Sequence, residues 1–212
     1  MNPDDHKFYF FFDFASPYSY LSFFRIKKFF IHNFQEENIC LCPFLLGVVF
    51  KNNGWNTSPF NIFPAKGEYM WKDVKRQATK YNLPFQRPVE FPAYSLHATR
   101  VFYALSSSPL QWKYVQAVFQ YEFQDSKDTK EKRILKEILE RELLLPNADE
   151  ILEHSTSDSV KELVRSQTEL AIQNKIFGAP SFLYQNELFW GDDRLEDAIG
   201  FYLAQKKEIR NI

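Results

Sequence analysis

Short apolar runs lie near both ends of the chain, and their length is typical of β-strands. Residues 8–12 are all aromatic, and residues 39–46 form a second apolar run. Near the C-terminus, residues 181–184 and 187–190 are separated by Gln185-Asn186, which predicts a β-hairpin. The pattern therefore predicts two strands at each end of the chain.

The segments between these strands show helical periodicity. Residues 20–30 carry apolar side chains at helical spacing after Ser16, the expected N-cap, and Pro17, the expected first helical residue. The pattern of residues 64–176 predicts helices throughout, with a polar loop at residues 84–92 between the first two of them. The expected starts of the helices in this middle part are Pro64, Ser95, the Ser108-Pro109 pair, Lys130, Asn147 with Glu150 as a capping box, and Ser157.

Residues 47–63 show neither the strand pattern nor the helical periodicity, and they contain turn signals such as Asn53-Gly54. We expect a loop here, and loops of this length usually have a function such as binding. The predicted order is βαβ, six helices, then a hairpin and a final helix after residues 191–194. Because the hairpin can complete the sheet begun by residues 8–46, the pattern predicts one α/β domain interrupted by an all-helical insertion.

The charge balance favours a small molecule as the partner. Lys and Arg number 26 against 27 Asp and Glu, so no bulk field attracts nucleic acid or an acidic membrane. Two Asp precede the aromatic run and Asp13 ends it, so we expect neither a signal peptide nor a transmembrane helix and predict a cytoplasmic protein. The Cys and His spacing predicts no zinc site.

The two cysteines, Cys40 and Cys42, lie on one predicted strand. We expect the strand to point their side chains apart, so that they form no disulfide with each other. The strand also places them away from the start of the first helix. We therefore predict that neither cysteine is catalytic.

Ser16 lies where the first strand runs into the first helix. The N–H groups at the start of a helix have no acceptors within it, and the helix dipole has its positive end there. Such a place stabilises an anion. A Ser-Pro pair is also a common structural cap, worth about 1 kcal/mol of stability. From the residues alone, both interpretations remain open.

The first turn has the layout of a thioredoxin-like active site, but Ser16-Pro17-Tyr18-Ser19 replaces Cys-x-x-Cys, so it cannot cycle a disulfide. Together with other motifs, this turn resembles the family of 2-hydroxychromene-2-carboxylate isomerases and kappa-class glutathione transferases. The motifs are Phe12-Asp13, residues 16–20, Leu45-Leu46-Gly47 with Lys51, Asn56 ahead of Pro59, Pro64-Ala65-Lys66 with Tyr69-Met70, residues 177–180 and residues 188–194. The resemblance implies a thioredoxin-like domain of residues 1–64 and 177–212. An all-helical domain, residues 65–176, is inserted between its βαβ and ββα halves.

The resemblance also implies bound glutathione and assigns roles to individual residues. Ser16 donates a hydrogen bond to the glutathione sulfur, which favours the nucleophilic thiolate. Ala179, before a Pro180 expected to be cis, pairs its backbone with the cysteinyl part. Asp192 and Asp193 are assigned to the γ-glutamyl amine, and Lys66 and Asn56 to the glycine carboxylate. Arg194 follows the acidic pair and is assigned to hold the loop or to neutralise the pair.

Three functions are compatible with this resemblance. The first choice is a glutathione-dependent isomerase, in which the thiolate adds reversibly to a conjugated, aromatic oxo-acid and glutathione is returned. The alternatives are a kappa-like transferase, which consumes glutathione, and a non-enzymatic glutathione or peptide binder. As in the family, we expect a homodimer.

The expected walls of the substrate pocket are Tyr18, Tyr20, Tyr69, Trp71 and Tyr94. Tyr94, where the family often has Asn, and residues 123–128 depart from the family pattern. Both departures lie in the helical part. The resemblance therefore says less about the second substrate than about glutathione.

Overall fold

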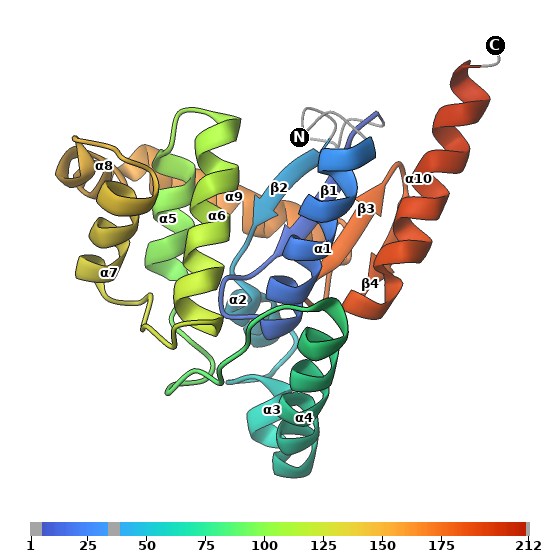
Figure 1. Ribbon diagram of the computed structural model, residues 1–212, viewed down its shortest axis with the longest axis horizontal. Coiled ribbons are helices and arrows are strands. Elements are labelled where there is room, and N and C mark those ends of the chain that lie inside the picture. The colour runs from blue at the N-terminus through green and yellow to red at the C-terminus, as the bar shows by residue number, and fades with distance from the viewer. Residues whose placement is uncertain (1–5, 34–38, 211–212) are drawn as a thin grey trace.

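The computed structural model describes residues 6–33 and 39–210. A four-stranded sheet lies at its centre (Figure 1), with the order β2-β1-β3-β4. The strands are β1 (Phe8–Phe12), β2 (Ile39–Pro43), β3 (Ser181–Tyr184) and β4 (Glu187–Trp190). β1 runs parallel to β2 and antiparallel to β3, and β3 and β4 form a hairpin. The parallel pair and the hairpin predicted from the sequence are confirmed.

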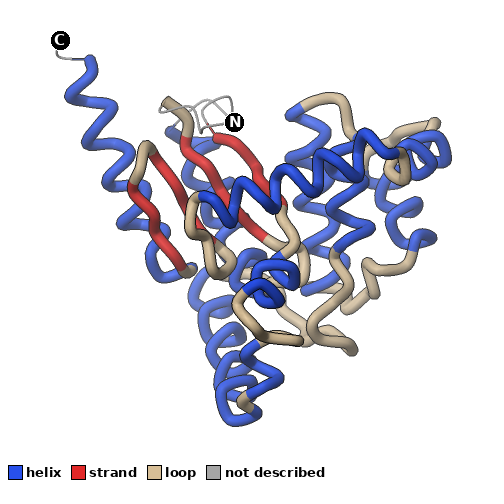
Figure 2. Tube along the Cα trace, turned by 180° about the vertical axis from the view of Figure 1, so that it is seen from behind, coloured by secondary structure: helices blue, strands red, loops and turns tan. Residues whose placement is uncertain are grey.

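β1 is aromatic because both of its faces are buried. Phe8, Phe10 and Phe12 join the larger core cluster with side chains of α1 (Pro17–Asn33), α6 (Ser108–Phe123) and α10 (Leu195–Arg210). Phe11 points to the opposite face and joins a smaller cluster with Ala171 of α9 (Asp158–Gln173). Figures 1 and 2 show α1 and α10 on one face of the sheet and α9 crossing the other.

The remaining helices lie between β2 and β3 in the sequence. They are α2 (Leu46–Asn52), α3 (Pro59–Ile62), α4 (Pro64–Tyr81), α5 (Leu96–Ala104), α7 (Lys132–Glu137), which continues into the π-helical turn Ile138–Glu142, and α8 (Ala148–His154). In Figure 1 the helices α5 to α8 form a group on one side, while α3 and α4 extend from the lower end. The division into residues 1–64 with 177–212 and an inserted 65–176 stays a prediction. One observation bears on it, because α9 covers a face of the sheet although it was assigned to the insertion.

The prediction of a loop at residues 47–63 is wrong, because this segment contains most of α2 and all of α3. Ser58 caps α3 by accepting a hydrogen bond from the Phe60 N–H, and Pro59 is the first helical residue. This is the same Ser-Pro start signal that was used for α1. The predicted strand at 39–46 ends earlier, at Pro43, since α2 begins at Leu46.

The helix caps agree with the sequence at some ends and differ at others. Ser157 caps α9 as predicted, with its Oγ accepting from the Val160 N–H at 3.4 Å. The starts at Pro64 for α4 and Ser95 for α5 also agree. Three starts differ: α6 begins at Ser108 with Ser107 as its N-cap, α7 begins at Lys132 and not at Lys130, and Asn147 makes no side-chain capping bond to α8. The predicted capping box at α8 therefore does not form.

Cys40 and Cys42 are both free, in agreement with the prediction of no disulfide. The expectation that they point apart is wrong. Residues two positions apart in a strand share a face, and both cysteines pack into the smaller core cluster. Burial raises the pKa of the Cys42 thiol well above its usual value. Within residues 6–33 and 39–210, no helix has the length and apolar character needed to cross a membrane.

Candidate active site

Ser16 occupies the turn between β1 and α1 and makes two side-chain hydrogen bonds. Its Oγ accepts from the backbone N–H of Ser19 at 3.1 Å, which confirms the predicted N-cap. The same hydroxyl donates to the carbonyl of Ala179 at 3.0 Å. Ser16 therefore caps α1 and also ties this turn to the segment that precedes β3.

The start of α1 keeps one backbone donor free for an anion. Pro17 has no N–H, and the N–H of Ser19 is bound by Ser16. Among the described residues, the N–H of Tyr18 has no acceptor. This donor and the positive end of the helix dipole lie at the same turn. The expected cis peptide bond between Ala179 and Pro180 is confirmed.

Most of the predicted site residues border one cavity of about 980 Å³. Its walls come from the β1–α1 turn, α2, α3, α4, residues 91–96 and the ends of the β3–β4 hairpin. The predicted residues that line it are Ser16, Asn56, Lys66, Ala179, Pro180, Asp192 and Asp193. Arg194 is not part of the lining. A cavity of this volume is at the upper end of the range of about 300–1,000 Å³ that is usual for ligand sites.

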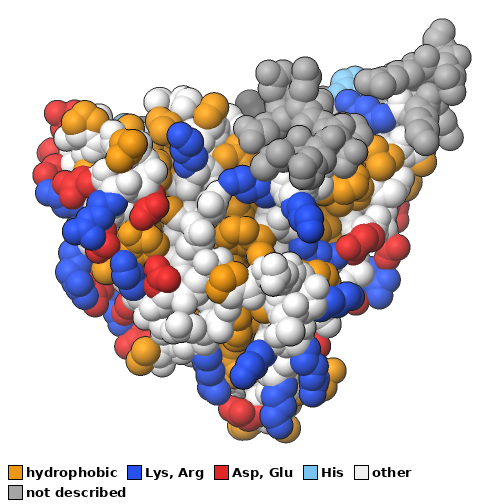
Figure 3. Space-filling model, viewed as in Figure 1, with side chains coloured by type: hydrophobic (Ala, Val, Ile, Leu, Met, Phe, Trp, Pro, Cys, Tyr) orange, Lys and Arg blue, Asp and Glu red, His pale blue; other side chains and the backbone are white. Residues whose placement is uncertain are grey.

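Lys66 is an exposed cation at one side of this cavity. Its Nζ lies 5.7 Å from the centre of the Phe60 ring, and it has no carboxylate partner among the described residues. α4 carries five Lys or Arg against two Asp or Glu. Lys and Arg side chains accordingly gather over the lower part of the molecule, where α4 lies (Figure 3). This side of the cavity therefore suits a carboxylate.

The adjacent acidic residues Asp192 and Asp193 have different surroundings. Asp192 is buried, and its Oδ1 accepts from Ser22 Oγ at 2.8 Å and pairs with Arg25 at 2.7 Å. Burial raises the pKa of Asp192, while Arg25 and Ser22 act in the opposite direction. Arg25 also donates to the Asp192 carbonyl at 2.6 Å. Asp192 therefore fastens α1 to the turn before α10, and its charge is already compensated.

Asp193 is the acidic residue that remains open to the cavity. Its side chain is 75% exposed and pairs with Arg194 at 3.1 Å. Arg194 also pairs with Asp197 at 2.8 Å. Arg194 thus lies outside the cavity, as a partner of the acidic residue and not as a wall.

Sequence reasoning assigned Lys66 and Tyr69 of α4 to the site but missed Asp73 and Gln77, which continue the same polar stripe. Lys66, Tyr69, Asp73 and Gln77 all line the cavity. Their spacing of three or four residues places them on one helix face, and this signal was present in the sequence. Asp73 accepts a hydrogen bond from the Tyr18 hydroxyl at 2.8 Å. Burial and then the Asp73 carboxylate raise the pKa of Tyr18, so its phenol stays protonated.

The expected aromatic residues divide into wall and core. Three line the cavity: Tyr18, Tyr69 and Tyr94. Tyr20 is fully buried among core aromatic rings, and Trp71 packs against Phe91 with ring centres 4.8 Å apart. The structure adds Phe177 and Trp190, which also line the cavity with ring centres 4.8 Å apart. Both residues belong to motifs of the family resemblance, residues 177–180 and 188–194, but the sequence assigned neither of them a place in the cavity wall.

Residues 8–200 match the sequence pattern of the DSBA-like thioredoxin domain. The chain belongs to the DSBA-like thioredoxin family. This DSBA-like chain is 28% identical over 205 residues to glutathione S-transferase kappa 2 of Caenorhabditis elegans, covering 91% of this chain and 89% of the relative. It is 27% identical over 200 residues to 2-hydroxychromene-2-carboxylate isomerase of Pseudomonas sp. strain C18, covering 90% and 89%.

The fold of this DSBA-like chain is also that of a solved isomerase. A structure of 2-hydroxychromene-2-carboxylate isomerase superimposes with a TM-score of 0.82 and 26% sequence identity, covering 95% of this chain and 98% of that chain. The thioredoxin-like fold predicted from the sequence is confirmed. The resemblance to isomerases and kappa-class glutathione transferases is confirmed as well.

Proposed function

We propose that this DSBA-like protein is a glutathione-dependent isomerase of the 2-hydroxychromene-2-carboxylate isomerase type. The observation that supports it best is the convergence on one cavity of Ser16, the Tyr18 N–H and the Ala179 backbone, with the unpaired Lys66 at its edge. Ser16 and the Tyr18 N–H suit a thiolate, the Ala179 backbone suits a peptide, and Lys66 suits a carboxylate. Glutathione combines these features.

The binding mode that we propose begins with an exchange of hydrogen bonds at Ser16. In the free protein the Ser16 hydroxyl donates to the Ala179 carbonyl. The backbone N–H of the cysteinyl residue of glutathione takes over this carbonyl and releases the hydroxyl to the sulfur. The hydroxyl, the Tyr18 N–H and the helix dipole then all favour the thiolate over the thiol.

The two ends of glutathione have separate partners in this proposal. Lys66 and Asn56 hold the glycine carboxylate, and Asp193 accepts from the γ-glutamyl ammonium. Asp192 acts indirectly, because Arg25 already compensates its carboxylate. Its role is to hold the turn that presents Asp193.

The proposed reaction uses this thiolate as a reversible nucleophile. The sulfur adds to a conjugated carbon–carbon double bond of an oxo-acid, and the electron pair moves to the carbonyl oxygen. The former double bond then rotates as a single bond. When the electron pair returns, the double bond forms again in the other geometry and the thiolate leaves. Covalent catalysis of this type divides a difficult rotation into easier steps.

A kappa-like transferase is the second candidate, because the identity to the Caenorhabditis elegans kappa 2 transferase, 28%, is close to the 27% identity to the isomerase. In that reaction the same thiolate attacks an electrophile and stays attached. The homodimer suggested by the family resemblance remains part of the proposal.

The amount of glutathione consumed distinguishes these functions. We expect a panel of conjugated oxo-acids and aryl halides, assayed with and without glutathione, to show isomerised oxo-acid while the glutathione concentration stays constant. Consumption of one glutathione per product would favour the transferase. Binding without turnover of any compound would favour the non-enzymatic binder. A double Cys40→Ser, Cys42→Ser variant is the control, and it should keep the activity because the reacting sulfur belongs to glutathione.

A further inference from the structure

A second cavity of about 420 Å³ lies between α2, α5 and α9. Leu45, Val48 and Leu96 line both this cavity and the large one, so the start of α2 and the start of α5 form a shared wall. None of the residues assigned to glutathione lines the second cavity.

The charged lining of this cavity is mainly basic. Arg100 from α5 and Lys161 and Arg165 from α9 line it, together with the single acidic residue Glu169. Arg165 pairs with Glu169 at 2.9 Å, and both side chains are largely exposed. Lys161 pairs with an exposed aspartate on its own helix at 2.9 Å. Exposed pairs of this type are weak and exchange readily with solvent.

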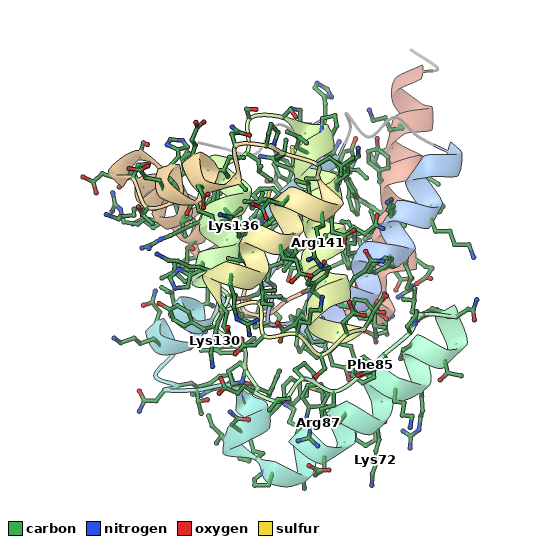
Figure 4. All side chains as sticks on the ribbon, turned by 60° about the vertical axis from the view of Figure 1, so that its left-hand side comes forward. Lys72, Phe85, Arg87, Lys130, Lys136 and Arg141 are labelled. Atoms are coloured by element: carbon green, nitrogen blue, oxygen red, sulfur yellow. The ribbon has the colours of Figure 1, made fainter. Side chains whose placement is uncertain are left out.

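Arg100 differs from several other cations of the helical region. Lys130, Lys136 and Arg141, labelled in Figure 4, each have a carboxylate within 3.1 Å. Arg100 is half-buried and makes no hydrogen bond or ion pair with any described residue, and its Nε is fully buried without an acceptor. Because this Nε is enclosed, a ligand in the cavity would reach the terminal Nη groups of Arg100, which have no partner among the described residues either. A guanidinium is also the side chain that best matches a carboxylate in geometry.

The remainder of the lining determines what kind of anion fits. Five aliphatic side chains contribute to it: Leu45, Val48, Leu96, Val164 and Ile172. Thr168 offers little further binding capacity, because its hydroxyl donates to the Val164 carbonyl at 2.9 Å and accepts from the Leu45 N–H at 3.2 Å. Asn52, which is exposed, adds one side-chain amide. The cavity therefore combines an apolar wall with this amide and the unpaired Arg100 guanidinium.

We propose that this cavity is a binding site for a small organic monocarboxylate, with its carboxylate on Arg100 and its apolar body against the aliphatic wall. An inorganic anion would leave that wall unused. The neighbouring His97 is consistent with an uncompensated positive charge here. Its pKa is lowered by burial and, after that, by Lys132 and Arg100. A carboxylate bound to Arg100 offsets part of this charge and raises the pKa of His97.

The test uses the full chain with three probes: benzoate, its neutral analogue benzamide, and inorganic phosphate at matched ionic strength. We expect calorimetry to show saturable binding of benzoate and much weaker binding of the other two. Arg100→Gln should lower the affinity for benzoate about tenfold or more, as expected for the loss of a charge-assisted hydrogen bond. Arg165→Gln is the matched control, because its side chain is exposed and already paired, and it should change benzoate affinity little.

Two further measurements separate this site from the glutathione site. Lys66→Ala should weaken glutathione binding and leave benzoate binding unchanged. Arg100→Gln should weaken benzoate binding and leave glutathione binding unchanged. In the unmodified protein, an NMR titration should show a higher His97 pKa when benzoate is bound, which requires no variant to fold. The proposal is overturned if benzoate does not bind, if Arg100→Gln binds it normally, or if phosphate binds as tightly. It is also overturned if glutathione displaces benzoate.

Discussion

The Ser16→Ala variant removes both hydrogen bonds that the Ser16 hydroxyl makes. Loss of the N-cap bond to the Ser19 N–H should cost about 1 kcal/mol of the free energy of unfolding. Loss of the bond to the Ala179 carbonyl, which joins the first turn to the segment before β3, should cost about 1 kcal/mol more. We therefore expect a total of about 2 kcal/mol, measured by urea denaturation of the protein without ligand.

Ser157→Ala is the matched control for this measurement. Ser157 caps α9 with the same geometry but makes no bond to a distant segment, so its loss should cost about 1 kcal/mol or less. As the thiolate donor, Ser16 should also affect turnover, so Ser16→Ala should slow turnover with little change in glutathione affinity. If Ser16→Ala costs no more than Ser157→Ala and turns over normally, Ser16 is only a cap.

Three further changes have expected outcomes. Glutathione at about 100 times its Kd should stabilise the protein by about 2.7 kcal/mol, measured by thermal unfolding. Lys66→Ala should reduce this stabilisation at the same glutathione concentration, because the glycine carboxylate loses its cation. Arg25→Met should cost about 3–5 kcal/mol in urea denaturation, because the buried Asp192 carboxylate loses its cation and keeps the hydrogen bond from Ser22. Burial raises the pKa of Glu122 in the folded protein. Between the pKa of Glu122 in the unfolded chain and its higher pKa in the folded protein, the free energy of unfolding therefore falls as the pH rises. Glu122→Gln should therefore gain stability over the unmodified protein across that range.

The Lys66 and Arg25 substitutions each have a control on the same chain. Lys72→Ala lies on α4 outside the cavity and projects from the molecule (Figure 4), so it should leave glutathione stabilisation unchanged. Arg194→Met removes only exposed pairs and should cost less than about 1 kcal/mol. Equal losses in the variant and its control would refute the assignments of Lys66 and Arg25. A stability difference for Glu122→Gln that does not vary with pH would refute the role of the buried charge.

The sequence was sufficient for elements whose pattern is local. The aromatic β1, the Ser16 cap and the hairpin depend on neighbouring residues, and the structure contains all three. The helices α2 and α3 were missed because their short turns show little periodicity. The Ser58-Pro59 start signal was present, but the turn-forming residues around it favoured a loop.

Residues of the candidate site could be predicted from the sequence where they belong to a motif. Their burial and partners could not be predicted, because these depend on tertiary contacts. Asp192 and Asp193 are adjacent in the sequence, yet one is buried against Arg25 and the other is exposed. Only the packing of α1 against the turn before α10 makes this distinction. The bond between Tyr18 and Asp73 likewise joins two helices, although the spacing along α4 was visible in the sequence.

The thiol pKa of glutathione bound to the unmodified protein tests the central claim most directly. It can be measured by following thiolate absorbance against pH, with the free tripeptide as the reference. We expect a pKa below the usual thiol value of about 8.5, because the Ser16 hydroxyl, the Tyr18 N–H and the helix dipole all stabilise the thiolate. Absence of binding at millimolar glutathione, or a bound thiol that titrates like the free one, would contradict the account.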